Sequence, residues 1–385
     1  MLDIFGLREA DDPPPLVELD PALRENVRTV IVVLADGLGT GQLERLVARG
    51  AMPFLASLLD RAQRRDAAQL LDCTSVFPST TAAAITTMNT ARTPQEHGNL
   101  AYFLWLEEFA AVTQMLRWGR AGQRRGSFFD DERLDPRSYA RVRSIHGRLR
   151  ERGISSSVIE PDAFRHEAME RMHASEAQFV GYVIPSGIAV RLREALAPQT
   201  GPAYVYAYWQ GIDYVAHRFG PESAEHEDEA AAFDLAIGRA FGGRPAGDVL
   251  VLLTADHGHA EVAHSSFIDL DDDPGLAALL RHPLAGEPRV PFFYTDHPQR
   301  VIAHLEREYP GIFFPMERDE AIAAGLFGRG DATAARSRVG EVVALLDGDR
   351  GASLVRVEGQ SLRQRGSHGG MTPSEMRIPV LAWRC

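Results

Sequence analysis

The sequence has few cysteines and no long apolar run, and each absence excludes a class of protein. Its 385 residues include two cysteines, Cys73 and Cys385, which are too few for a disulfide framework. No uncharged apolar stretch approaches the roughly 18 residues of a transmembrane helix. The first residues are acidic and contain neither the basic nor the apolar region of a secretory signal. These absences predict a cytoplasmic protein with no membrane partner.

Positive charge is scarce relative to negative charge. The formal net charge is −12, whereas proteins that bind a nucleic-acid backbone usually present a basic face. We therefore do not expect a nucleic-acid polymer as the main partner. An acidic protein that acts on a small anion needs local positive charge, and metal ions are one source of it. The sequence leaves the oligomeric state open.

Apolar runs alternate with helical patterns along most of the chain. Such apolar runs lie within five segments: 27–39, 155–159, 202–213, 248–258 and 377–383. Strands that alternate with helices are typical of a parallel sheet. The sequence therefore predicts an α/β fold with a doubly wound, mostly parallel central sheet and helices on both faces.

Residues 265–365 break this alternation. They contain an acidic loop at 269–274, several prolines and one helical stretch at 298–308. We interpret them as an inserted cap segment. The chain then divides into an irregular N-terminal lead-in at 1–21, an α/β catalytic core at 22–264 and 366–385, and the cap at 265–365.

Three of the predicted strands are followed by an aspartate. Asp36, Asp213 and Asp256 each come within a few residues of the end of an apolar run. In open α/β sheets, ligands bind at the carboxyl ends of the strands. Each aspartate alone would be explained as a turn residue, but three of them at one edge predict a metal site.

Histidines accompany these aspartates. His217 follows Asp213 by four residues, so on a helix both side chains can reach one ion; an exposed helix pair is the alternative. His257 follows Asp256 directly, and His368 lies beside glycines that permit close backbone approach. Three carboxylates and three imidazoles are about enough for two zinc sites. We expect three further histidines near the motifs to support structure or orient ligands: His97, His259 and His264.

A candidate nucleophile lies in FPSTTAAAITTM. Thr80 and Thr81 lie where a proline-marked turn meets a helix of small residues. Free N–H groups and the helix dipole make such a place favourable for an anion. A threonine hydroxyl is not ionised unaided, but coordination to a metal lowers its pKa. The alternative is that one threonine only caps the helix.

Six short motifs follow one another along the chain. They are ADG at Asp36, FPSTT at 77–81, HG at 97–98, D-x-x-x-H at 213–217, ADHG at 255–258 and GSHGG at 366–370. In this order they resemble the alkaline phosphatase superfamily, most closely its nucleotide pyrophosphatase/phosphodiesterase branch. The resemblance spans residues 27–262 and 366–383, with the variable segment between them.

The resemblance implies two zinc ions about 4 Å apart, for which manganese can substitute. One ion would be held by Asp213, His217 and His368, and the other by Asp36, Asp256, His257 and the oxygen of Thr81. Thr81 would be the nucleophile, because its spacing to His97 fits the family's pattern better than that of Thr80. It would attack phosphorus and form a phospho-threonine intermediate that water then hydrolyses.

The implied activity is that of a phosphodiesterase or nucleotide pyrophosphatase acting on a small phosphate ester or nucleotide. The family often has an asparagine that contacts a phosphoryl oxygen. The corresponding position in this chain is near Tyr102, and Asn99 lies three residues earlier, so either side chain is a candidate for substrate binding. Two alternatives remain: a phosphomonoesterase or phosphonate hydrolase with the same site, or a metal-stabilised binding protein without turnover.

Overall fold

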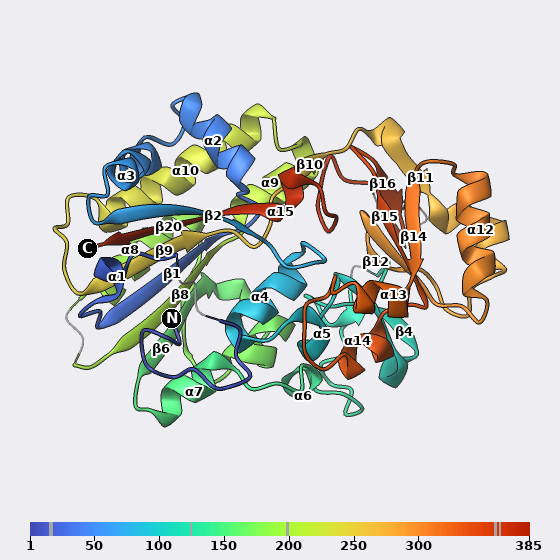
Figure 1. Cartoon of the computed structure of the whole chain (residues 1–385), viewed down its shortest axis with the longest axis horizontal. Coiled ribbons are helices and arrows are strands. Elements are labelled where there is room, and N and C mark those ends of the chain that lie inside the picture. The colour runs from blue at the N-terminus through green and yellow to red at the C-terminus, as the bar shows by residue number, and fades with distance from the viewer. Residues whose placement is uncertain (15–17, 124, 198–199, 358–359, 362) are drawn as a thin grey trace.

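Two seven-stranded sheets organise the part of the chain that the structure describes. The computed structural model describes residues 1–14, 18–123, 125–197, 200–357, 360–361 and 363–385. One sheet is mostly parallel and has helices on both sides, and the second lies beside it, on the right of Figure 1.

The central sheet has the strand order β2–β20–β9–β1–β8–β6–β7. The strands are β2 (Ala68–Thr74), β20 (Arg377–Arg384), β9 (Val249–Thr254), β1 (Thr29–Ala35), β8 (Ala203–Trp209), β6 (Ser155–Pro161) and β7 (Gln178–Tyr182). β1 pairs in parallel with β8 and β9, and β6 pairs in parallel with β7 and β8. β20 runs antiparallel between β9 and β2. The predicted doubly wound, mostly parallel sheet is confirmed.

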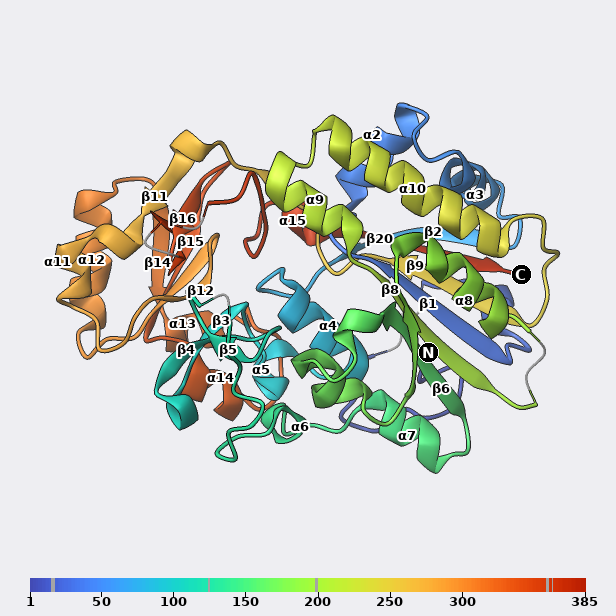
Figure 2. The ribbon, with the colours of Figure 1, turned by 180° about the vertical axis from the view of Figure 1, so that it is seen from behind.

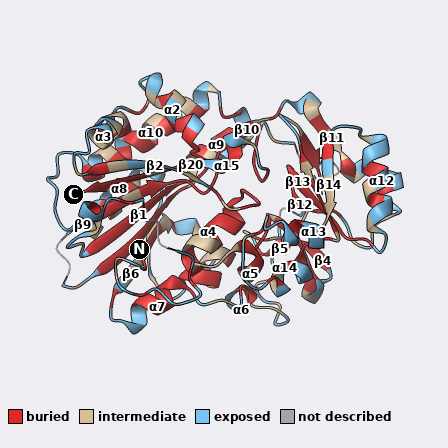
Figure 3. Cartoon of the chain, in the orientation of Figure 1, coloured by how far each residue is buried: buried red, intermediate tan, exposed pale blue. Residues whose placement is uncertain are grey.

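Successive residues of β1 enter different helical layers because strand side chains alternate between the two faces of a sheet. Ile31 and Val33 pack against one set of helices, whereas Val30 and Val32 pack against the other. Both faces are therefore buried, as Figure 3 shows, which explains the uninterrupted apolar run in the sequence. The first set comprises α2 (Thr40–Ala48), α3 (Pro53–Gln63), α8 (Ile188–Ala195) and α10 (Ala224–Phe241), and the second α4 (Thr81–Thr90) and α7 (Ile145–Glu151).

The second sheet has antiparallel neighbours in the order β14–β15–β13–β12–β3–β4–β5. The strands are β14 (Phe313–Glu317), β15 (Val342–Leu346), β13 (Val290–Phe293), β12 (Ala285–Glu287), β3 (Phe103–Leu106), β4 (Ala111–Gln114) and β5 (Gly119–Arg120). The sheet thus takes strands from both sides of residue 264, including three that the sequence analysis assigned to the core. The predicted helix at 298–308 is α12 (Pro298–Glu308). The cap boundaries themselves stay a prediction.

A buried ion pair joins the second sheet to the C-terminal part of the core. Arg289, in the turn between β12 and β13, donates to both carboxylate oxygens of Glu375 at 3.1 Å. Both side chains are fully buried. Glu375 lies in α15 (Pro373–Met376) and also accepts the N–H of Gly370 at 2.8 Å. The pair therefore holds the loop that carries His368 against the second sheet.

Helix α9 (Gly211–Phe219) lies at the end of the central sheet that faces the second sheet, as Figure 2 shows. It follows β8 after a single residue, so its first turn lies at the carboxyl edge of the strands. In the part of the chain that the structure describes, no helix is both long and apolar enough to cross a membrane.

Candidate active site

The three predicted aspartates lie at one edge of the central sheet. Asp36 follows β1 directly, Asp256 lies just beyond β9, and Asp213 lies in the first turn of α9. Ala35 of β1 is in register with Trp209 of β8, so these strands end at the same level. The fold therefore brings together carboxylates that are far apart in the sequence.

Three oxygen atoms surround Nε2 of His257. Thr81 Oγ1 lies at 3.2 Å, Asp256 Oδ2 at 3.4 Å and Asp36 Oδ1 at 3.5 Å. Four tetrahedral ligands bound to zinc at about 2.0–2.2 Å would be separated from one another by about 3.3–3.6 Å. This first cluster therefore has the dimensions of the ligand set of one ion.

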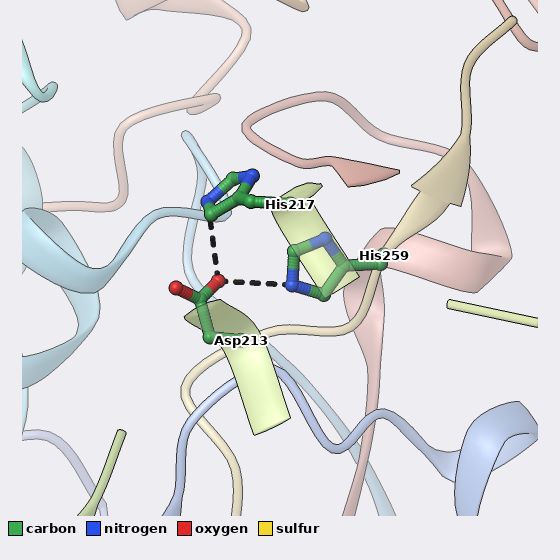
Figure 4. Close-up of side chains that lie close together, drawn as sticks. All are labelled: Asp213, His217 and His259. Atoms are coloured by element: carbon green, nitrogen blue, oxygen red, sulfur yellow. Dashed lines mark hydrogen bonds and ion pairs between the residues drawn. The ribbon is translucent and has the colours of Figure 1, made fainter. Parts of the chain in front are cut away.

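A second cluster surrounds Oδ1 of Asp213. His217 Nε2 lies at 3.3 Å and His368 Nε2 at 3.8 Å from this oxygen. His259 Nε2 is closer still, at 2.9 Å, and Figure 4 shows both rings approaching the same oxygen of Asp213, His217 from above and His259 from the right. The rings of His257 and His368 stack with centroids 3.7 Å apart, so the two clusters adjoin.

Backbone carbonyl groups orient the three histidines of the predicted ligand set. Because a carbonyl oxygen only accepts, each bonded Nδ1 carries the proton and each Nε2 presents a lone pair to the site. This arrangement is usual for metal-binding histidines. The bonds join Nδ1 of His217 to Gly366 O (2.7 Å), Nδ1 of His257 to Gly258 O (3.1 Å) and Nδ1 of His368 to Ser79 O (2.9 Å).

Two carboxylate oxygens of the first cluster lack a compensating partner. Asp36 Oδ1 and Asp256 Oδ2 are buried and have no hydrogen bond to any described residue. Burial, reinforced by the charges of Asp256 and Asp213, raises the pKa of Asp36 well above its ordinary value. Unpaired buried carboxylates are unfavourable, and divalent cations would compensate both oxygens. The residues present therefore fit metal ions.

The pKa of Asp213 is shifted in the opposite direction from that of Asp36. Burial favours its protonated form, but His217 and the hydrogen bond from His259 outweigh burial and hold the pKa of Asp213 well below its ordinary value. Burial lowers the pKa of His259 to about 3 and that of His368 well below its ordinary value. His259 and His368 are therefore held in the neutral form, and neutral imidazole is the form that binds metals.

Helix α4 begins at Thr81, so this hydroxyl lies beside the first-turn N–H groups. Thr80 is the N-cap residue, but its side chain makes no hydrogen bond to the helix and instead contacts Glu287. Ser79 fixes the preceding turn, because its Oγ donates to Gly370 O at 2.8 Å. Of the two threonines, the structure brings only Thr81 into the cluster around His257.

The two candidates for phosphate contact lie in different places. Asn99 is fully buried, and its Nδ2 donates to Ala82 O at 3.1 Å and to Thr86 Oγ1 at 3.0 Å beneath α4. Tyr102 lines a pocket of about 580 Å³ that also includes Thr81 and Asp213. Only Tyr102 is therefore placed to meet a substrate.

Glu287 also lines this pocket, although no motif in the sequence includes it. Its carboxylate accepts the N–H of Tyr102 at 2.6 Å. Burial raises the pKa of Glu287 to about 8, although hydrogen bonds from Thr80 and from the N–H of Tyr102 oppose the shift. Of the other histidines, His264 lines the pocket, whereas His97 is fully buried and hydrogen-bonded to Thr87.

The family model described as type I phosphodiesterase / nucleotide pyrophosphatase matches residues 30–371. The chain belongs to this family. The match includes all six motifs, from ADG at Asp36 to GSHGG at 366–370, and it confirms the resemblance to this branch of the alkaline phosphatase superfamily. Family membership makes the chain a hydrolase of phosphoric ester or anhydride bonds. Among curated proteins, no sequence matches the chain.

Solved structures share the fold at low sequence identity. Murine ectonucleotide pyrophosphatase / phosphodiesterase 5, in an inactive form in complex with AMP, has a TM-score of 0.68 and 15% identity over 91% of this chain and 87% of its own. Phosphonoacetate hydrolase from Sinorhizobium meliloti 1021, in complex with phosphonoformate, has a TM-score of 0.62 and 18% identity over 93% of this chain and 90% of its own. These structures bind small nucleotide or phosphonate ligands.

Proposed function

We propose that the chain is a two-metal phosphohydrolase that cleaves phosphodiester or phosphoanhydride bonds through a phospho-threonine at Thr81. The observation that carries this proposal is the cluster around His257 Nε2, in which the Thr81 hydroxyl lies beside two carboxylate oxygens without hydrogen-bond partners. A capping threonine alone would not explain these three contacts.

The residues that would hold two divalent ions are the predicted ones. Asp36, Asp256, His257 and the Thr81 oxygen would hold one, and Asp213, His217 and His368 the other. When bound, such ions supply positive charge that stabilises the attacking and leaving oxygens of an in-line displacement. We propose zinc, with manganese as a substitute, because the ligands combine imidazoles with carboxylates.

The chain itself positions the reacting groups. The Thr81 oxygen forms a bond to phosphorus, and the first-turn N–H groups of α4, which have no intrahelical acceptor, face the phosphoryl oxygens. Tyr102 closes the pocket on the side of the second sheet. His217, His257 and His368 are held by backbone carbonyls and need little reorganisation to act.

Elemental analysis and a substrate panel test this proposal together. The purified protein should contain two transition-metal ions per chain, and it should hydrolyse bis(p-nitrophenyl) phosphate or a nucleoside triphosphate faster than p-nitrophenyl phosphate. One ion per chain, or only calcium or magnesium, would contradict the metal assignment. Two ions with no turnover of any phosphate or phosphonate would contradict the catalytic assignment and favour a binding protein.

A second candidate keeps the site and changes the substrate. The side chain at the asparagine register is Tyr102, which has a hydroxyl in place of an amide, and this departure favours testing phosphomonoesters and phosphonates too. Hydrolysis of phosphonoacetate or p-nitrophenyl phosphate at a higher kcat/KM than any diester would replace the diesterase proposal.

A further inference from the structure

Helix α9 presents two interleaved pairs of side chains to the pocket. Asp213 and His217 are four residues apart, and so are Tyr214 and Arg218, so each pair shares a helix face. The first pair belongs to the second cluster. Tyr214 and Arg218 line the same pocket and, because they are exposed, lie nearer to solvent than the first pair.

Arg218 is a free cation in this pocket. Among the described residues, its guanidinium has no ion pair and no hydrogen bond, and its Cζ lies 5.6 Å from the centroid of the Phe219 ring. Arg363, which lines the pocket too, is instead held by Asp269 at 2.5 Å. The sequence contains no lysine, so arginines provide all the permanent side-chain positive charge here.

The position of Arg218 relative to Thr81 indicates which part of a substrate it meets. In an in-line displacement, the leaving oxygen departs on the side of phosphorus opposite the nucleophile. Thr81 belongs to the cluster around His257, whereas α9 carries Asp213 and His217 of the adjoining cluster. A leaving group would therefore depart towards α9 and meet its outer pair, Tyr214 and Arg218.

We propose that Arg218 is a specificity-determining residue that binds a negatively charged phosphate on the leaving group. This inference rests on the proposed function and narrows it to phosphoanhydrides, such as nucleoside triphosphates, over diesters of neutral alcohols. Tyr214, which is 68% exposed, forms the adjoining wall. Guanidinium groups suit this role because they bind phosphate in a bidentate manner.

The chemistry balances. The Thr81 oxygen bonds to phosphorus and its proton passes to solvent, while the bond from phosphorus to the bridging oxygen breaks. Pyrophosphate keeps that oxygen with its electron pair and is held by Arg218 until release. Water then adds its hydroxyl to phosphorus, the bond to Thr81 breaks, and a proton returns to the threonine oxygen.

Arg218→Gln tests the proposal against Arg239→Gln, a matched change at an exposed arginine of α10. For the metal-loaded enzyme, we expect kcat/KM for thymidine triphosphate to fall roughly 10- to 100-fold in Arg218→Gln, the range for a lost charge-assisted hydrogen bond. Hydrolysis of thymidine 5′-p-nitrophenyl phosphate, whose leaving group carries no phosphate, should change less than about threefold. Arg218→Lys should restore part of the loss, and Arg239→Gln should behave as the unmodified enzyme.

Binding gives a readout that does not require turnover. Calorimetric affinity for pyrophosphate should fall by a similar factor in Arg218→Gln, whereas affinity for inorganic phosphate should not. If Arg218→Gln lowers kcat/KM equally for both thymidine substrates, or leaves the affinity for pyrophosphate unchanged, the proposal is overturned. If the unmodified protein hydrolyses neither substrate, the proposed function fails, and the pyrophosphate titration alone decides whether Arg218 binds the anion.

Discussion

Nε2 of His259 lies 2.9 Å from Oδ1 of Asp213, closer than either histidine predicted to share a metal with that aspartate. Proximity alone would make His259 a ligand. Its other nitrogen argues otherwise, because Nδ1 is buried and has no hydrogen-bond partner in the described chain. An unpaired N–H is less favourable there than an unpaired acceptor, so the proton belongs on Nε2, where it is donated to Asp213.

Substitution of His259 should therefore weaken one metal site without abolishing it. His259→Ala removes the donor that orients Asp213, and removal of such partners typically lowers metal affinity about 10- to 100-fold. His257→Ala, the control, removes a proposed ligand and should leave one ion per chain and no activity. Metal content after dialysis against graded chelator measures both. Equal loss of metal in the two variants would make His259 a ligand.

The parts of this site that could be predicted from the sequence are the local ones. Asp36 directly follows a strand buried on both faces, and His217 lies one helical turn after Asp213. Both placements depend only on residues that are close in the sequence. His368 is different, because Ser79 positions it across 289 residues of sequence. Only the resemblance to a family identified its partners.

The second sheet could not be predicted from local sequence patterns. β3, β4 and β5 are short, and β12, the strand that joins β3 to the rest of the sheet, lies far along the chain, so no local periodicity revealed the pairing. Glu287 enters the pocket only because of that pairing. Asn99 and Tyr102 were equivalent candidates in the sequence, and they were separated only by the turn of chain that buries one and exposes the other to the pocket.

The buried pair of Arg289 and Glu375 should contribute to both stability and function. Glu375→Gln leaves the Arg289 charge buried without a counter-ion, which typically costs about 3–5 kcal/mol. It also weakens the anchor of the Gly370 N–H near His368. Glu227→Gln, which breaks a surface pair with Arg49, should cost only about 0–1 kcal/mol. Urea unfolding compares the two variants, and equal effects would show that the buried pair is not structurally important.

The N-terminal segment should be sensitive to acid through Asp12. Its carboxylate is buried and bonded to Arg148 and Arg92. Burial opposes ionisation, but these bonds prevail and lower the pKa of Asp12 from 3.8 to about 2. The carboxylate therefore contributes stability that is present above about pH 4 and is lost as the pH falls through about 2. The shift corresponds to about 2–3 kcal/mol.

Asp12→Asn removes that contribution at every pH. The difference in unfolding free energy between the unmodified protein and Asp12→Asn should be largest above pH 5 and should narrow as the pH falls towards 3. Urea titrations of both proteins, stripped of metal so that metal ligands do not dominate, measure this difference. A gap that stays constant from pH 6 to pH 3 would show that the carboxylate charge is not what holds the segment.

The two adjacent threonines give the sharpest test of the catalytic assignment. Thr81→Ala removes the oxygen that lies 3.2 Å from His257 Nε2, so turnover should fall by several orders of magnitude while at least one metal ion remains bound. Thr80→Ala keeps that oxygen and loses only the contact with Glu287, so its effect should be far smaller. Quenching the reaction in acid should trap labelled phosphate on the unmodified protein and on Thr80→Ala, but not on Thr81→Ala. Label retained in Thr81→Ala and lost in Thr80→Ala would place the nucleophile one residue earlier, because the phosphoryl group must be carried by the side chain that attacks phosphorus.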